Sequence, residues 1–87
     1  MIHVLIEGSV QGVGYRQFVK SRANKLNIRG WVKNLPDRRV EAMFLGSQEK
    51  LDLMIEQCRK GPFLAEVESL EIKEIPDQTF DSFEIIK

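Results

Sequence analysis

A loop with three glycines in seven residues, Gly8 to Gly14, is followed at once by Arg16. Glycines between a strand and a helix allow consecutive backbone N–H groups to converge on an anion. The helix that follows adds its own unpaired N–H groups and the positive end of its dipole. The alternative is a tight turn that simply requires glycine, and the glycine content alone does not decide between the two.

Arg16 favours the anion-binding interpretation of this loop. A cation in the first turn of a helix faces the unfavourable end of the dipole, which costs about 0.3–1 kcal/mol when it is exposed. An anion held between the loop amides and the guanidinium would turn this cost into a favourable interaction. The planar fork of donors on the arginine side chain also suits phosphate oxygens. The alternative is a solvated arginine that turns away from the helix end.

The glycine spacing excludes two common phosphate-binding loops. The pattern G-x-x-x-x-G-K-[ST] does not fit, because Gly8 and Gly12 are wrongly spaced and no Lys-Ser/Thr pair follows. The pattern G-x-G-x-x-G does not fit either, because Gln17 follows Gly12 and Gly14 where the third glycine is needed. We therefore expect neither a nucleoside triphosphate nor a dinucleotide as ligand.

Asn34 is the second candidate residue, between Trp31-Val32-Lys33 and Leu35-Pro36-Asp37. Asparagine beside a turn commonly hydrogen-bonds to nearby backbone. Its carboxamide can instead hold a water molecule, because it donates and accepts hydrogen bonds at once. The residues themselves leave both roles open.

The charges are unevenly distributed along a chain whose thirteen basic and thirteen acidic residues cancel. Residues 1–39 hold eight bases and two acids, whereas residues 40–87 hold five bases and eleven acids. This segregation suggests an anion near the first half, with a dipolar surface that binds nothing as the alternative. Overall neutrality counts against a nucleic-acid partner.

The composition indicates one small domain over residues 1–87, with 43% apolar residues. Its single cysteine, Cys58, excludes an internal disulfide and a zinc cluster, and its place on an apolar helix stripe predicts a core residue. The single histidine, His3, cannot anchor a metal alone. No signal-peptide pattern opens the chain, and no apolar run reaches the roughly 18 residues of a membrane helix. We expect a cytoplasmic monomer without a membrane partner.

The hydrophobic periodicity predicts an α+β fold that positions these residues. Strands are expected over 2–7, 28–35, 40–45, 67–75 and 80–86, and helices over 15–26 and 48–60. The alternation is disturbed near Ser69, as in a bulge. Trp31 and Phe44 are expected in the core. The order β-α-β-β-α-β matches the ferredoxin-like sandwich, an antiparallel sheet with two helices on one face and a short extra C-terminal strand.

Three segments of this sequence together resemble the acylphosphatase family. They are Gly8-x-Val10-Gln11-Gly12-Val13-Gly14-Tyr15-Arg16, Gly30-Trp31-Val32-x-Asn34 and Val40-Glu41-Ala42. The resemblance covers essentially the whole chain and implies the same ferredoxin-like fold. It further implies hydrolysis of the carboxyl–phosphate bond of a small acyl phosphate without metal or other cofactor. A carboxylate and inorganic phosphate are the implied products, and phosphate or other small anions are implied inhibitors.

The resemblance also implies roles for single residues. Arg16 matches the phosphate-binding catalytic arginine of the family, and Asn34 matches its water-orienting asparagine. The implied phosphate cradle is the backbone of Val10, Gln11, Gly12, Val13 and Gly14. Water is the expected nucleophile, because the loop holds no Cys, His or Asp and Ser9 has no evident base.

This sequence departs from the family pattern at two places. Tyr15 stands where the family often has phenylalanine, and Pro36-Asp37-Arg38-Arg39 stands where it commonly has Asp-Gly. Arg38 is therefore expected at a positive φ that glycine would adopt without penalty. A phosphate-sensing domain without catalysis is the rival class of function. An RNA-binding domain would need exposed aromatic residues that the strands over 2–7 and 40–45 lack.

Overall fold

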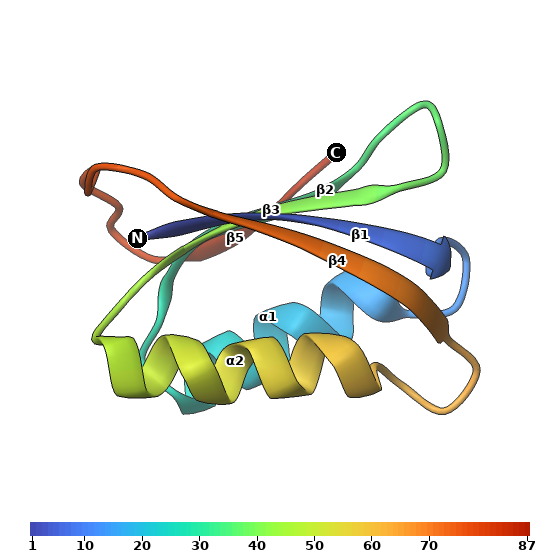
Figure 1. Ribbon diagram of the computed structural model, residues 1–87, viewed down its shortest axis with the longest axis horizontal. Coiled ribbons are helices and arrows are strands. Elements are labelled where there is room, and N and C mark those ends of the chain that lie inside the picture. The colour runs from blue at the N-terminus through green and yellow to red at the C-terminus, as the bar shows by residue number, and fades with distance from the viewer.

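A five-stranded sheet carries two helices on one face in the computed structural model, which describes residues 1–87 (Figure 1). The elements in chain order are β1 (Ile2–Ser9), α1 (Tyr15–Lys25), β2 (Arg29–Asn34), β3 (Val40–Leu45), α2 (Gln48–Lys60), β4 (Glu66–Glu74) and β5 (Phe83–Ile86). This arrangement confirms the predicted ferredoxin-like sandwich with an extra C-terminal strand. Neither helix has the length and apolar composition needed to cross a membrane.

The strands lie in the order β4-β1-β3-β2-β5. The pairs β4–β1, β1–β3 and β3–β2 are antiparallel, whereas β5 pairs parallel to β2. The expected last strand begins at Phe83 rather than at residue 80, and the first backbone hydrogen bond between this segment and β2 runs from the N–H of Gly30 to the carbonyl oxygen of Ser82. The parallel pairing places the C-terminal end of β5 beside the C-terminal end of β2.

The core lies between the helices and one face of the sheet. Val4, Val32 and Phe44 are fully buried there, and the ring of Phe44 stacks on Phe83 with 5.6 Å between centroids. The two helices bury Tyr15, Val19, Ala23, Leu51, Met54 and Cys58 against them. The expected core position of Phe44 is therefore confirmed.

Trp31 does not belong to the core cluster, which corrects the expectation from the sequence. Successive strand residues face opposite sides of a sheet, so the burial of Val32 against the helices places Trp31 on the other face. There the indole is half-buried, and the Lys33 ammonium lies 5.3 Å from its centroid.

The disturbance predicted near Ser69 is a bulge between β1 and β4. Glu7 is paired with Ser69, but the next residue, Gly8, is paired with Val67, so Glu68 is the extra residue. A bulge of this kind increases the local twist of the strands. It lies where β1 runs into the glycine-rich loop and so affects the direction in which that loop leaves the sheet.

Candidate active site

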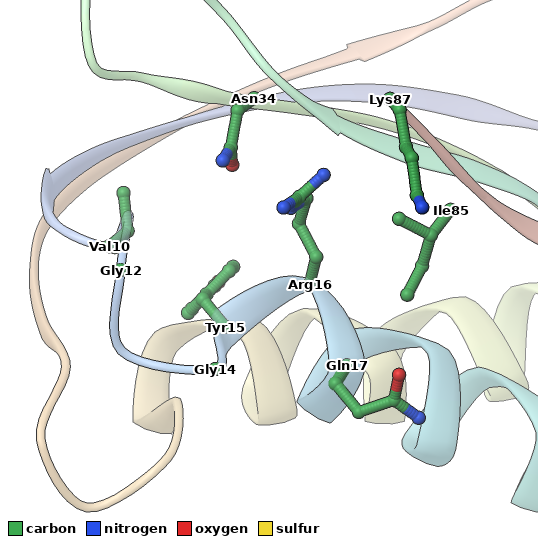
Figure 2. Close-up of a pocket in the computed structure, with 9 residues that line it drawn as sticks. All are labelled: Val10, Gly12, Gly14, Tyr15, Arg16, Gln17, Asn34, Ile85 and Lys87. Atoms are coloured by element: carbon green, nitrogen blue, oxygen red, sulfur yellow. The ribbon is translucent and has the colours of Figure 1, made fainter.

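The glycine-rich loop, the start of α1 and the ends of β2 and β5 enclose a pocket of about 290 Å³ (Figure 2). Its walls are formed by Val10, Gly12, Gly14, Tyr15, Arg16, Gln17, Asn34, Ile85 and Lys87. The topology explains why these segments meet. Strand β3 separates β1 from β2 in the sheet, and α1 packs under β2 and β5, so the loop from β1 to α1 passes below the end of β2.

The loop backbone is arranged so that its N–H groups remain free. Gly12 and Gly14 have φ values of 76° and 79°, which residues with a Cβ rarely adopt. A Cβ at either position would meet no atom within 4 Å, so the need for glycine is conformational rather than steric. No backbone N–H from Val10 to Gln17 donates a hydrogen bond within the protein. These donors and the N-terminal end of α1 together favour an anion in the pocket.

Arg16 provides a cation beside these donors. It lies in the first turn of α1, which contains no acidic residue, and it forms no salt bridge or hydrogen bond within the protein. Figure 2 shows its guanidinium pointing into the pocket toward Asn34 rather than away from the helix end. The structure therefore contradicts the alternative of an arginine turned away.

Asn34 is the last residue of β2, and its side chain points down into the same pocket (Figure 2). Its Oδ1 atom is buried and has no hydrogen-bond partner. A buried acceptor without a partner costs about 1–3 kcal/mol. The carboxamide makes no hydrogen bond to the neighbouring turn, which removes the turn-forming alternative. Its oxygen is instead available to a polar molecule in the pocket.

The hairpin between β2 and β3 contains the positive φ that its sequence predicts. Arg38 has a φ of 77°, and the chain closes through hydrogen bonds from Leu35 N–H to the Arg39 carbonyl oxygen at 2.8 Å and from Arg38 N–H to that of Leu35 at 3.2 Å. The Asp37 carboxylate accepts from the backbone N–H and the Nε of Arg39 at 3.1 and 2.8 Å. The backbone hydrogen bond is the main reason that the pKa of Asp37 is lowered.

Two predicted residues of the cradle, Gln11 and Val13, are not among the residues that line the pocket. Gln11 turns toward the hairpin, where its Nε2 donates to the carbonyl oxygens of Leu35 and Arg39. Val13 packs against the core. The backbone N–H groups of both residues donate no hydrogen bond within the protein, so they remain free for the cradle role that the family resemblance implies.

Tyr15 anchors the start of α1 below the pocket. It is 1% exposed, and its hydroxyl donates a hydrogen bond of 2.7 Å to the carbonyl oxygen of Cys58. Burial is the main cause that raises the pKa of Tyr15 far above its usual value. Burial also raises the pKa of the Cys58 thiol to about 12. The thiol therefore stays protonated at neutral pH and is a packing group, as its place in the sequence predicted.

Sequence reasoning missed the contribution of β5 to the pocket. Ile85 and Lys87 line it, and Figure 2 shows both side chains beside Arg16. They reach this position because Val32 pairs with Ile85 and Lys33 with Ile86 in the parallel ladder. Predicting this contribution would have required knowing that β5 pairs with β2. The sequence of a short edge strand does not indicate which strand it pairs with.

Comparison with known proteins gives a consistent result. Residues 2–85 match the family model described as acylphosphatase. Similar proteins include the acylphosphatase of Acaryochloris marina, 43% identical over 99% of this chain and 92% of that protein, and that of Methylococcus capsulatus, 46% identical over 85% and 80%. The crystal structure of acylphosphatase from Bacillus subtilis is similar with a TM-score of 0.95 at 31% identity, over 99% of this chain and 97% of that one.

Proposed function

The chain belongs to the acylphosphatase family, and we propose which of its residues carry out the reaction. It is an acylphosphatase, a hydrolase that cleaves the carboxyl–phosphate bond of acyl phosphates to a carboxylate and inorganic phosphate. One observation carries the assignment of roles. Residues with free backbone N–H groups, Arg16 with its unpaired guanidinium and Asn34 with its unpaired Oδ1 line a single pocket.

The backbone from Val10 to Gly14 and Arg16 bind the phosphoryl group in this proposal. An acyl phosphate has a good leaving group, so holding it in position and stabilising charge supply most of what catalysis requires. The N–H groups and the guanidinium neutralise the equatorial oxygens as the P–O bond breaks. These donors supply the electrostatic stabilisation, and we therefore propose hydrolysis that is independent of a metal ion.

Asn34 orients the attacking water in this proposal. Its unpaired Oδ1 accepts a hydrogen from the water, which turns an oxygen lone pair of the water toward the phosphorus. Among the residues that line the pocket, no side chain is a carboxylate, an imidazole or a thiol. The Tyr15 hydroxyl is engaged with Cys58 and has a raised pKa, so it is a poor base. We propose that the substrate phosphate itself accepts the proton.

We also propose that the enzyme works as a monomer in the cytoplasm. One chain supplies every residue that lines the pocket. The only cysteine, Cys58, is a buried free thiol, which is the usual state of cysteine in a reducing compartment. Analytical ultracentrifugation across the working concentration range tests the oligomeric state, and a dimer would contradict this part of the proposal.

Hydrolysis of benzoyl phosphate in the presence of a chelator tests the proposed chemistry. We expect turnover that is unchanged by the chelator and inhibited by inorganic phosphate, because the product occupies the same cradle. Loss of turnover with the chelator would contradict the metal-independent mechanism. Binding of phosphate without turnover would instead indicate the phosphate-sensing domain. An acid limb in kcat that disappears on mutation of one carboxylate would overturn the proposed role of the substrate as base.

A further inference from the structure

The side chain of Gln11 joins the phosphate-binding loop to the neck of the β2–β3 hairpin. Its Nε2 donates two hydrogen bonds of 2.9 Å, one to the carbonyl oxygen of Leu35 and one to that of Arg39. These two residues close the hairpin, because the N–H of Leu35 also donates to the Arg39 carbonyl oxygen. The Nε2 group thereby uses both of its hydrogens, and the carboxamide bridges the two arms of the hairpin at its neck.

The hairpin neck adjoins the residue pair that contains Asn34. Asn34 and Val40 are paired at the last position of the β2–β3 ladder, directly beside Leu35 and Arg39. The Asn34 oxygen has no partner within the protein, so no hydrogen bond of its own fixes its direction. The direction of the side chain therefore depends on the backbone that carries it, and Gln11, in the loop between β1 and α1, is hydrogen-bonded to the adjoining backbone.

The hairpin itself offers limited rigidity to Asn34. Arg38 occupies a left-handed conformation that is costly for a residue with a Cβ. The ion pair between Asp37 and Arg39 is exposed, and such pairs contribute little because water and salt screen them. The two hydrogen bonds from Gln11 are partly buried and come from a segment distant in sequence. They are therefore contacts that hold the neck against the phosphate-binding loop.

We propose that Gln11 is a positioning residue, which sets the position of Asn34 relative to the phosphate cradle. This inference rests on the proposed function, in which the cradle holds the phosphoryl group and Asn34 orients the water. The backbone of Gln11 belongs to the cradle, and its side chain holds the strand end that carries Asn34. Gln11 thus links the site of the phosphoryl group to the site of the attacking water, so that water bound at Asn34 lies in line with the bond that breaks.

The substitution Gln11→Met tests this role, because it keeps the length of the side chain and removes both donors. We expect kcat for benzoyl phosphate to fall roughly 10- to 100-fold, since small displacements at a reacting centre have effects of this size. We expect the inhibition constant of inorganic phosphate to change by less than about twofold, because phosphate does not require Asn34. An unchanged kcat, or an equal loss of phosphate affinity, would overturn the proposal.

The matched control is Gln57→Met, which removes a carboxamide that also joins two elements. Gln57 on α2 accepts a hydrogen bond from Arg22 on α1, away from the pocket. We expect this variant to lose some stability while keeping kcat. A fall in kcat equal to that of Gln11→Met would indicate a general loosening of the fold and would overturn the specific role of Gln11.

A double-mutant cycle identifies the residue through which Gln11 acts. In an Asn34→Ala background, Gln11→Met should change kcat by less than about twofold, because the group that it positions is already gone. A full and independent effect in that background would overturn the proposal. The wild-type enzyme tests the proposed function separately. If the wild type fails to hydrolyse acyl phosphates, the proposed function is wrong, whereas an active wild type with an active Gln11→Met variant contradicts only this inference.

Urea unfolding of Gln11→Met and of a second variant, Gln11→Glu, tests whether the fold itself requires Gln11. The glutamate has the same shape but presents oxygen atoms to the two carbonyl oxygens, so we expect a loss of kcat at least as large. Loss of cooperative unfolding in both variants would also overturn the proposal, because Gln11 would then be required for folding rather than for the position of Asn34.

Discussion

The hydroxyl of Tyr15 donates a hydrogen bond to the carbonyl oxygen of Cys58 and so completes the end of α2. In a helix this oxygen accepts from the N–H four residues later, but that residue is Pro62, which has none. Tyr15 is also the first residue of α1, immediately before Arg16. The contact therefore ties the helix that carries Arg16, the proposed phosphate-binding arginine, to the second helix, at the position where the family often has phenylalanine.

The substitution Tyr15→Phe is expected to destabilise the protein by about 1–3 kcal/mol, because it leaves the Cys58 carbonyl oxygen buried without a donor. The ring keeps its packing, so the loss comes from the hydrogen bond and not from a cavity. Urea unfolding measured by circular dichroism gives the change. A variant as stable as the wild type would show that this oxygen finds another donor.

The free energy of unfolding should fall as the pH rises above about 9. Both Tyr15 and Cys58 have pKa values that are raised in the folded protein, the latter to about 12. The stability from their protonated forms is thus fully present below their unfolded pKa values and is lost as the pH rises beyond them. Each group can contribute a slope of up to about 1.4 kcal/mol per pH unit.

Urea unfolding between pH 7 and 11 measures this dependence. The variant Cys58→Ala should begin to lose stability at a pH about one unit higher than the wild type, because only the tyrosine then titrates and its usual pKa lies higher. A wild-type free energy that stays constant from pH 8 to 11 would contradict the prediction.

The parts of the site that could be predicted from the sequence are those with a local cause. The clustered glycines and the arginine at the expected helix start lie within one segment, so the residues alone raise an anion-binding loop as one alternative, and the family resemblance supplies the roles of the cradle and Arg16. The bulge opposite Gly8 follows from a disturbed alternation, and the positive φ of Arg38 follows from its place in a turn where the family commonly has Asp-Gly. Each depends on neighbours in sequence rather than on the packing of distant elements.

The parts that were missed depend on pairing between distant segments. Lys87 lines the pocket only because β5 adds to the sheet parallel to β2, and no residue of β5 specifies that partner. The direction of the Gln11 side chain depends on where the hairpin neck lies. The prediction of Trp31 in the core disagrees with its alternation with the buried Val32, and the period-two alternation of the strand is the better guide.

The substitution Arg38→Gly should stabilise the protein by roughly 0.5–1 kcal/mol. Glycine removes the cost of a left-handed conformation, about 1–2 kcal/mol for a residue with a Cβ, and part of that gain is offset by its greater freedom in the unfolded chain. Thermal and urea unfolding measure the change, with Arg38→Ala as the control for loss of the charge. A destabilised glycine variant would contradict this account of the turn.

The substitution Arg16→Ala should weaken inhibition by inorganic phosphate and lower kcat about 10²- to 10³-fold, because in the proposed mechanism the guanidinium stabilises charge in the ground state and in the transition state. Steady-state kinetics with benzoyl phosphate and phosphate measure both effects. Lys25→Ala removes a cation from the exposed far end of the same helix and serves as the control. Near-normal hydrolysis by Arg16→Ala would remove its catalytic assignment.

The substitution Asn34→Ala should lower kcat about 10²-fold while leaving the inhibition constant of phosphate nearly unchanged, because in the proposed mechanism the side chain orients the water and does not bind the phosphoryl group. The same variant should be at least as stable as the wild type, since it removes a buried oxygen that has no partner. Asn24→Ala, at an exposed position of α1, controls for loss of a carboxamide. A residue held only for structure would lose stability on truncation, so a variant that unfolds more readily yet keeps its turnover would show that Asn34 has a structural role.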